Sequence, residues 1–199
     1  MIGKDKIFTT IEKVMAQSKA DQTEAVFLGS STGLTRFANS FIHQNVAETV
    51  NRIYFRVAVG KQLGVASTTS FSVTDLRRCM KAATEIAKRQ RENPHFSGFP
   101  GVQQYPEVHT YVEKTARFSP KQRASKLKRI FTKSINNDLD AAGALTTGEG
   151  EIAVLNSNGL RAYQPFTTAS GNIVIMGEDS SGYTTFTSRD VDDLDFVKL

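Results

Sequence analysis

The feature that most constrains the fold is a strict alternation of apolar and polar residues before position 60. The apolar residues occupy every second position: Ile53, Phe55, Val57 and Val59. The positions between them hold Arg52, Tyr54 and Arg56. Because successive side chains of a strand point to opposite faces, the pattern predicts an antiparallel strand with one buried and one wet face. Gly60 and Lys61 then allow a tight reversal into a second strand at residues 62–67.

Three other stretches repeat apolar residues at helical spacing, which predicts three amphipathic helices. The first stripe consists of Ile7, Phe8, Ile11, Val14 and Met15. The second consists of Leu76, Cys79, Met80, Ala83, Ile86 and Ala87, and the third of Ala124, Leu127, Ile130, Phe131 and Ile135. Ser72, with Asp75 three residues later, is a plausible capped start for the second helix, and Ser119 before Pro120 is a strong start for the third.

The remaining elements are predicted to be strands and turns. A buried strand at residues 25–28 is followed by a turn at residues 29–33, a strand at 34–38 and a long extended stretch from residue 41. Later strands are expected at residues 152–155, 161–169, 172–176 and 183–187. The segment 93–111 breaks all periodicity with three prolines and two glycines. We therefore predict an α+β fold of two small domains, 1–92 and 112–199, joined by a proline-rich linker at 93–111, with amphipathic helices packed on mostly antiparallel sheets.

The composition limits which disulfide, metal and nucleophile sites the chain can hold. Cys79 is the only cysteine, which excludes a disulfide framework within the chain and a multi-cysteine zinc site. Because it falls on an apolar helical stripe, we expect a buried thiol and not a nucleophile. The histidines His43, His95 and His109 have no metal-ligand spacing, so no metal site is expected in this chain. The N-terminus lacks the apolar segment of a signal peptide and no long apolar run occurs, which predicts a cytoplasmic protein that does not span a membrane.

The formal net charge of +5 is unevenly distributed. The basic residues of the middle are Arg77, Arg78, Lys81, Lys88, Arg89, Arg91, Lys121, Arg123, Lys126, Lys128, Arg129 and Lys133. The acidic residues of the C-terminal end are Glu178, Asp179, Asp190, Asp192, Asp193 and Asp195. The basic residues could attract nucleic acid or an acidic partner, but they alternate with apolar residues and are interpreted as solvated faces of two helices. Nucleic acid is not a favoured partner, since aromatic residues are not interleaved with them.

Two polar motifs are candidate sites. Residues 29–33 match G-x-S-x-G formally, but a strand and not a helix follows, so the motif is interpreted as a connecting turn. A denser cluster lies on the predicted hairpin just beyond it. Its candidate substrate or interface residues are Arg36, Asn39, His43, Gln44 and Asn45. These side chains could line a cleft or a subunit interface, or they could simply fix the turn through local hydrogen bonds.

At this cluster the sequence resembles a known family. Residues 36–45, then Gly64-Val65-Ala66-Ser67-Thr68, then a helix opening at Leu76-Arg77-Arg78, are similar to the first domain of the TldD/PmbA family. Asn156-Ser157-Asn158-Gly159-Leu160 and Asp179-Ser180-Ser181-Gly182-Tyr183 are similar to its middle domain. The resemblance covers nearly the whole chain in the family's order.

The resemblance implies an origin in a cytoplasmic peptidase, historically called a modulator of DNA gyrase, whose TldD and PmbA subunits pair and cleave peptides or unfolded polypeptides. In TldD-type subunits it implies a zinc ion in the C-terminal half, held by a helical histidine pair and a later cysteine, with a glutamate as general base. None of these ligands can be assigned to a residue of this sequence, and the subunit type stays open. We therefore expect no catalytic residue here, and a role in the substrate chamber and subunit interface. The alternative is a non-catalytic assembly or binding module for a partner subunit or nucleic acid.

Overall fold

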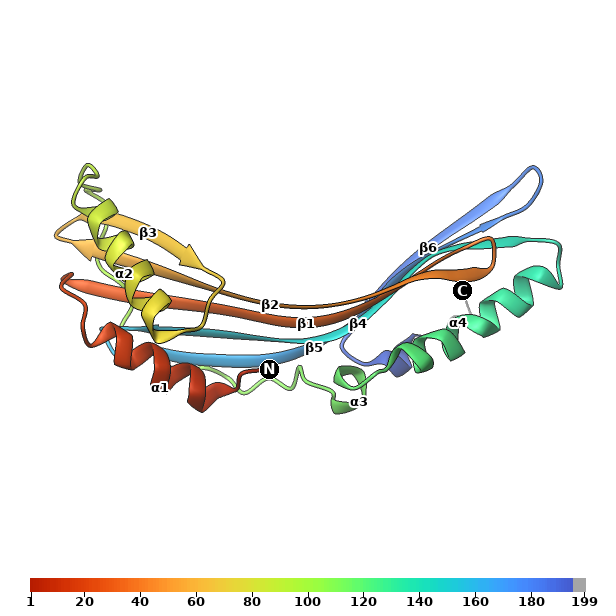
Figure 1. The fold of residues 1–199 in the computed structure, drawn as a ribbon, viewed down its shortest axis with the longest axis horizontal. Helices are drawn as coiled ribbons and strands as arrows, with labels where there is room; N and C mark the ends of the chain where they lie inside the picture. Colours follow the sequence, from red (N-terminus) through yellow and green to blue (C-terminus); the bar gives the residue numbers. More distant parts are fainter. Residues whose placement is uncertain (195–199) are drawn as a thin grey trace. The chain divides into compact units, whose positions relative to one another are not determined.

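The computed structural model describes residues 1–194. Along the chain its helices and strands are α1 (Lys4–Met15), β1 (Gln22–Ala38), β2 (Phe41–Val59), β3 (Gln62–Thr68), α2 (Val73–Ala87), α3 (Glu113–Ala116), α4 (Pro120–Ile135), β4 (Asp140–Asn156), β5 (Arg161–Met176), β6 (Ser181–Ser188) and the 3-10 helix η1 (Val191–Asp193) (Figure 1). The strands form one antiparallel sheet in the order β3-β2-β1-β4-β5-β6. The predicted α+β class is confirmed.

The three predicted helices form where local signals place them. Ser72 caps α2 by accepting a hydrogen bond from the backbone N–H of Asp75 at 3.1 Å. Ser119 and Gln122 form a reciprocal capping box at the start of α4, with Pro120 at its first position. These caps satisfy N–H groups that the first turn of a helix leaves without a partner.

The chain divides into two compact units, and each collects three separate segments. Unit 1 comprises residues 1–29, 50–108 and 151–164, whereas unit 2 comprises residues 30–49, 109–150 and 165–199. The strands β1, β2, β4 and β5 each contribute residues to both units. The consecutive domains 1–92 and 112–199 stay a prediction. The composition of a linker does not show that a strand contributes residues to two compact units.

The core of unit 1 lies between α1, α2 and one face of the sheet. Its largest fully buried members include Phe27, Phe55 and Leu76. Ile53, Phe55 and Val57 are fully buried, which confirms the alternation predicted for this strand. The strand pairs with β3 from Ile53 opposite Thr68 to Val59 opposite Gln62.

A buried carboxylate ties the start of α1 to β4. Glu151 is 1% exposed and accepts hydrogen bonds from the backbone N–H groups of Ile2 at 2.6 Å and Gly3 at 3.1 Å. The hydroxyl of Tyr163 donates a third hydrogen bond to the same side chain at 2.9 Å. The negative charge also lies at the N-terminus of α1, where the helix dipole is positive. Glu151 therefore stabilises this end of the helix by hydrogen bonding and by charge.

Residues 93–108 contain no helix or strand, but they belong to unit 1 and pack against its other segments. Phe99 is 5% exposed, and its backbone N–H donates to Oε1 of Gln22 at 2.8 Å. The side chain of Asn156 donates to the carbonyl of Pro100 at 2.8 Å. A proline-rich segment cannot pair as a β-strand, so its backbone groups need other partners. Here the amide side chains of Gln22 and Asn156 provide them.

Unit 2 has its own core beneath α4. The buried members are Phe37, Phe118, Leu127, Ile130, Ala141, Leu145, Ala169, Ile173, Val191 and Leu194. The rings of Phe37 and Phe131 lie 5.3 Å apart, which joins β1 to α4. Within residues 1–194, no helix is both long and apolar enough to span a membrane.

Two predicted interruptions are wrong. Residues 29–33 form no turn, because β1 runs without a break from Gln22 to Ala38. Residues 161–176 likewise form the single strand β5. The glycines in these two strands do not reverse the chain. They leave room for side chains that pack closely against the backbone. A Cβ on Gly33 would lie 2.6 Å from the guanidinium of Arg123, and one on Gly171 would lie 2.6 Å from the ring of Phe186.

Candidate functional site

The hairpin between β1 and β2, which holds all five candidate residues, lies in unit 2. Asn39 and Ser40 form its tip with φ angles of 49° and 57°. Positive φ at both positions suits the right-handed twist of the two strands, and asparagine tolerates it better than most residues. Ser40 also anchors the tip to the start of β4, since its backbone N–H donates to the carbonyl of Ala141 and its hydroxyl accepts from the N–H of Ala141, both at 3.0 Å.

Of the other candidate residues, Arg36 and Gln44 form a cross-strand pair, Asn45 pairs with Thr35, and His43 is exposed. Arg36 donates to Oε1 of Gln44 at 3.3 Å on the solvent side. Thr35 donates its hydroxyl proton to Oδ1 of Asn45 at 2.6 Å. His43 is exposed on β2. The structure therefore brings Arg36 and Gln44 together, whereas Asn45 belongs to a network that reaches the interior.

That network ends at Arg123, which the sequence placed on a solvated helix face. This interpretation is wrong for Arg123, because only 3% of the residue is exposed. Its Nε donates to Oγ1 of Thr35 at 2.9 Å, and Nη1 donates to the carbonyl of Phe118 at 2.9 Å and to Oγ1 of Thr147 at 3.0 Å. Burial lowers the pKa of its guanidinium.

Arg123 thus fixes α4 against β1 and β4 through neutral oxygen acceptors. The chain Asn45, Thr35 and Arg123 links the exposed hairpin to the helix through two hydrogen bonds. Apart from the glycine at position 33, no signal in the sequence distinguishes Arg123 from its basic neighbours.

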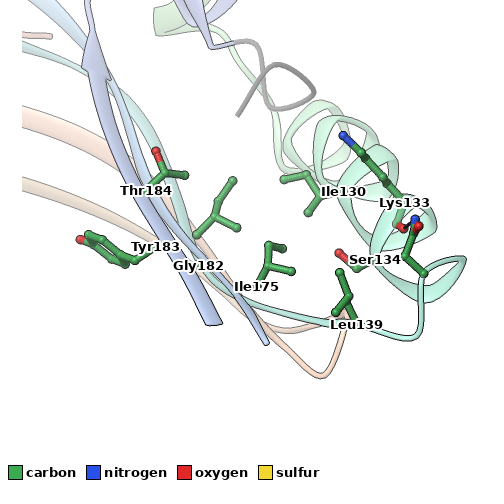
Figure 2. A pocket seen from close by; sticks show the side chains of 10 residues that line it. Ile130, Lys133, Ser134, Leu139, Ile175, Gly182, Tyr183 and Thr184 are labelled. Carbon is green, nitrogen blue, oxygen red and sulfur yellow. Dashed lines mark hydrogen bonds between the residues drawn. The ribbon is translucent and has the colours of Figure 1, made fainter. Parts of the chain in front are cut away.

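A groove of about 470 Å³ opens between α4 and the β5–β6 strands (Figure 2). Apolar side chains of Ile130, Leu139, Ile173 and Ile175 line it, together with Lys133, Ser134, Asn137, Gly182, Tyr183 and Thr184. Tyr183 is 68% exposed. The groove can accept an apolar side chain, and its polar lining residues can orient the backbone that carries it. Sequence reasoning missed this groove because its lining comes from elements about 50 residues apart.

Neither of the two hydrolytic arrangements considered from the sequence, a metal site and a nucleophile elbow, is assembled among residues 1–194. Within residues 1–194, no three His, Cys, Asp or Glu side chains come together as a metal site requires. All three histidines are exposed, and Cys79 lies in the core of unit 1, where burial raises the pKa of its thiol. The zinc implied by the resemblance therefore does not fit the side chains described here. Ser31 of the G-x-S-x-G match lies inside a continuous strand, so it has no nucleophile-elbow geometry.

Comparison with known proteins shows what the chain is similar to. Residues 111–198 match the model of the PmbA/TldA metallopeptidase central domain. No curated protein matches the chain. The fold is similar to that of TldE from Thermococcus kodakarensis, with a TM-score of 0.75 and 19% identity over 94% of this chain and 43% of that one.

Two further solved structures have the same fold. They are candidate modulators of DNA gyrase from Thermotoga maritima and Bacteroides thetaiotaomicron, each with a TM-score of 0.79 and 16% identity. The first match covers 95% of this chain and 45% of that one, and the second covers 97% and 47%. The chain thus spans less than half the length of these relatives. The expected resemblance is confirmed: residues 111–198 match the central domain of the PmbA/TldA metallopeptidases, and solved structures with the names of that family share the fold of nearly the whole chain.

Proposed function

We propose that this chain is the N-terminal, non-catalytic portion of a TldD/PmbA-type metallopeptidase that cleaves peptides or unfolded polypeptides in the cytoplasm. The observation that carries the proposal is the extent of the match: a family-specific central domain at residues 111–198, within a fold that matches over 94% of the chain. In this proposal unit 2 helps to form the substrate chamber and the interface with a TldD- or PmbA-type subunit. Zinc is held by residues of a complete TldD-type subunit.

The geometry of unit 2 supports this role. Arg36, His43 and Gln44 expose hydrogen-bonding side chains on a hairpin whose tip is anchored to β4. The groove between α4 and the β5–β6 strands adds an apolar site in the same unit. A chamber that handles many sequences needs exposed polar groups for peptide backbones and apolar recesses for side chains. Unit 2 offers both.

The test uses the native gene product, isolated from its own organism with antibodies against this chain. Its intact mass is compared with the 21.9 kDa of this chain. We expect a mass about twice as large, as the coverage of the solved relatives implies. We also expect hydrolysis of an unstructured polypeptide such as casein, and loss of that activity with a zinc chelator. Absence of cleavage, or cleavage that the chelator leaves unchanged, would refute the proposal.

The hairpin is tested in the same assay. Replacing Arg36 and His43 by alanine should lower the rate of polypeptide cleavage without changing the circular dichroism spectrum, because both side chains are exposed. Arg91→Ala is the matched control, since Arg91 is an exposed arginine of unit 1. Equal rates for the hairpin variant and this control would remove the hairpin from the substrate path.

A further inference from the structure

The apolar groove between α4 and the β5–β6 strands continues into a second, basic groove along α4. This basic groove has a volume of about 620 Å³, and Lys128, Arg129 and Lys133 supply its positive charges. Lys133 and Asn137 line both grooves, so the two are contiguous, and all of their lining residues belong to unit 2. A ligand that lies across both contacts apolar side chains at one end and cations at the other.

The strand side of the apolar groove leaves room for a side chain. Ile173 and Ile175 of β5 line it, and their register partners on β6 are Thr184 and Gly182, which line it too (Figure 2). Cross-strand partners share one face of a sheet. A Cβ on Gly182 would meet no atom within 4 Å, so there is open space beside Ile175. An aromatic or aliphatic side chain of a ligand that enters this space is removed from water.

The charge of the basic groove is not balanced by acidic residues. Of the described residues that line the two grooves, none is Asp or Glu, and α4 itself contains neither. Lys128 and Arg129 are exposed, and within residues 1–194 they have no ion-pair partner. Lys114, in contrast, pairs with Asp192. Carboxylates of a ligand can therefore pair with these two cations without displacing a carboxylate of the described chain.

We propose that the two grooves together bind an extended segment of unfolded polypeptide in which acidic side chains flank an apolar one. The apolar side chain enters beside Ile175 and Gly182, and the acidic side chains lie along Lys128 and Arg129. This assignment rests on the proposed function, because it names the class of polypeptide that unit 2 selects. A wholly apolar segment would gain nothing from the basic groove, and a nucleic acid would gain nothing from the apolar one.

The test measures binding without cleavage, so that its failure is distinct from failure of the proposed function. The intact gene product is treated with a chelator and titrated into a fluorescein-labelled glycine–serine peptide that holds a phenylalanine followed by glutamates. Fluorescence anisotropy should give a Kd on the order of 10–100 µM. Replacing the phenylalanine by serine, or the glutamates by glutamines, should raise this Kd about tenfold or more. A peptide that binds equally well after either replacement, or a DNA duplex that binds more tightly than the peptide, overturns the proposal.

Gly182→Leu tests the apolar groove. The leucine should fill the space beside Ile175 and raise the Kd of the phenylalanine–glutamate peptide about tenfold or more, while the Kd of the serine-substituted peptide stays unchanged. Ser181→Leu is the matched control, because Ser181 is exposed and adjacent residues of a strand face opposite sides. Circular dichroism checks that each variant is folded. Equal Kd values for the two leucine variants would exclude the apolar groove as the binding site.

Lys128→Gln combined with Arg129→Gln tests the basic groove. This double variant should raise the Kd of the glutamate peptide about tenfold and leave that of the glutamine peptide unchanged, because only carboxylates attract these cations. The matched control is Arg77→Gln with Lys81→Gln, which removes the same charge from exposed positions of α2 in unit 1. If both double variants weaken binding equally, net charge and not the basic groove attracts the peptide, and the proposal is overturned.

Discussion

Replacing Gly33 by alanine is expected to destabilise the chain by displacing Arg123. A Cβ at position 33 would lie 2.6 Å from Nη1 and 2.7 Å from Nη2 of that guanidinium, closer than real Cβ contacts come. The guanidinium must then move away from three acceptors that it contacts at 2.9, 2.9 and 3.0 Å. Charge-assisted hydrogen bonds contribute about 1.5–3 kcal/mol each, and their partial loss should lower the free energy of unfolding by about 2–4 kcal/mol.

The same substitution should be tolerated once the guanidinium is absent. Arg123→Met alone should cost about 2–4 kcal/mol, because buried acceptors lose their donor while the desolvation of the charge is relieved. In that background Gly33→Ala should cost less than about 1 kcal/mol, since a methionine side chain can adapt. The two substitutions should therefore be coupled by about 2 kcal/mol.

Urea unfolding of the four proteins, followed by far-ultraviolet circular dichroism, measures this coupling. Gly182→Ala is the control, because no atom lies within 4 Å of a Cβ at that position of β6. Its effect should stay within about 0.5 kcal/mol. If Gly33→Ala costs the same in both backgrounds, within about 0.5 kcal/mol, the close packing of Arg123 against β1 is refuted.

Three further predictions follow from single contacts. Burial and the hydrogen bond to Glu149 raise the pKa of Tyr111 to about 12, so an absorbance titration should show a late step that Tyr111→Phe removes. Because this pKa exceeds the ordinary value of about 10, the stability that the contact contributes is present below pH 10 and is lost as the pH rises toward 12. A free energy of unfolding that does not change over that pH range would contradict this prediction. Cys79 is 6% exposed and burial raises the pKa of its thiol, so a thiol reagent should react at least about a hundredfold more slowly with the native chain than in urea, and similar rates would exclude a buried thiol. Gly64→Ala should cost at least about 4 kcal/mol in urea unfolding, because its Cβ would lie 2.0 Å from the carbonyl oxygen of Ala83 in α2; a loss below about 1 kcal/mol would show that α2 does not approach β3 so closely.

The elements that sequence predicted well are those specified by neighbouring residues. The apolar stripe of α1, the serine cap of α2 and the capping box of α4 all act within one or two helical turns. The reversal at Gly60 is equally local, and Gly60 adopts a positive φ of 59° there. Such signals are readable because a helix or tight turn satisfies its hydrogen bonds within a few residues.

The candidate site was predicted only in part. Residues 36–45 were recognised as a polar hairpin, and Asn39 does form its tip. The sequence could not separate the exposed pair of Arg36 and Gln44 from the network that contains Asn45. That separation depends on Thr35 and Arg123, which are 88 residues apart and meet only in the folded chain.

The first half of β4 was missed for a related reason. Residues 140–151 are rich in alanine and glycine and carry no apolar alternation, and Thr146 and Thr147 are their only β-branched residues. Their strand conformation comes from the neighbours β1 and β5 on either side. A Cβ on Gly148 would lie 2.4 Å from the carbonyl oxygen of Ser31, so a small residue is needed where these strands approach.

By itself, the sequence determined the helices, the β2–β3 hairpin, the α+β class and the resemblance to the TldD/PmbA family, because each depends on local periodicity or on contiguous motifs. The tertiary structure alone decided that β1 and β5 are unbroken, that Arg123 is buried and that four strands are shared between two compact units. It also decided that, among residues 1–194, β3 pairs with β2 only from Ile53 to Val59. All of these depend on which distant segments meet, and pairing between distant strands leaves little trace in the order of residues along one chain.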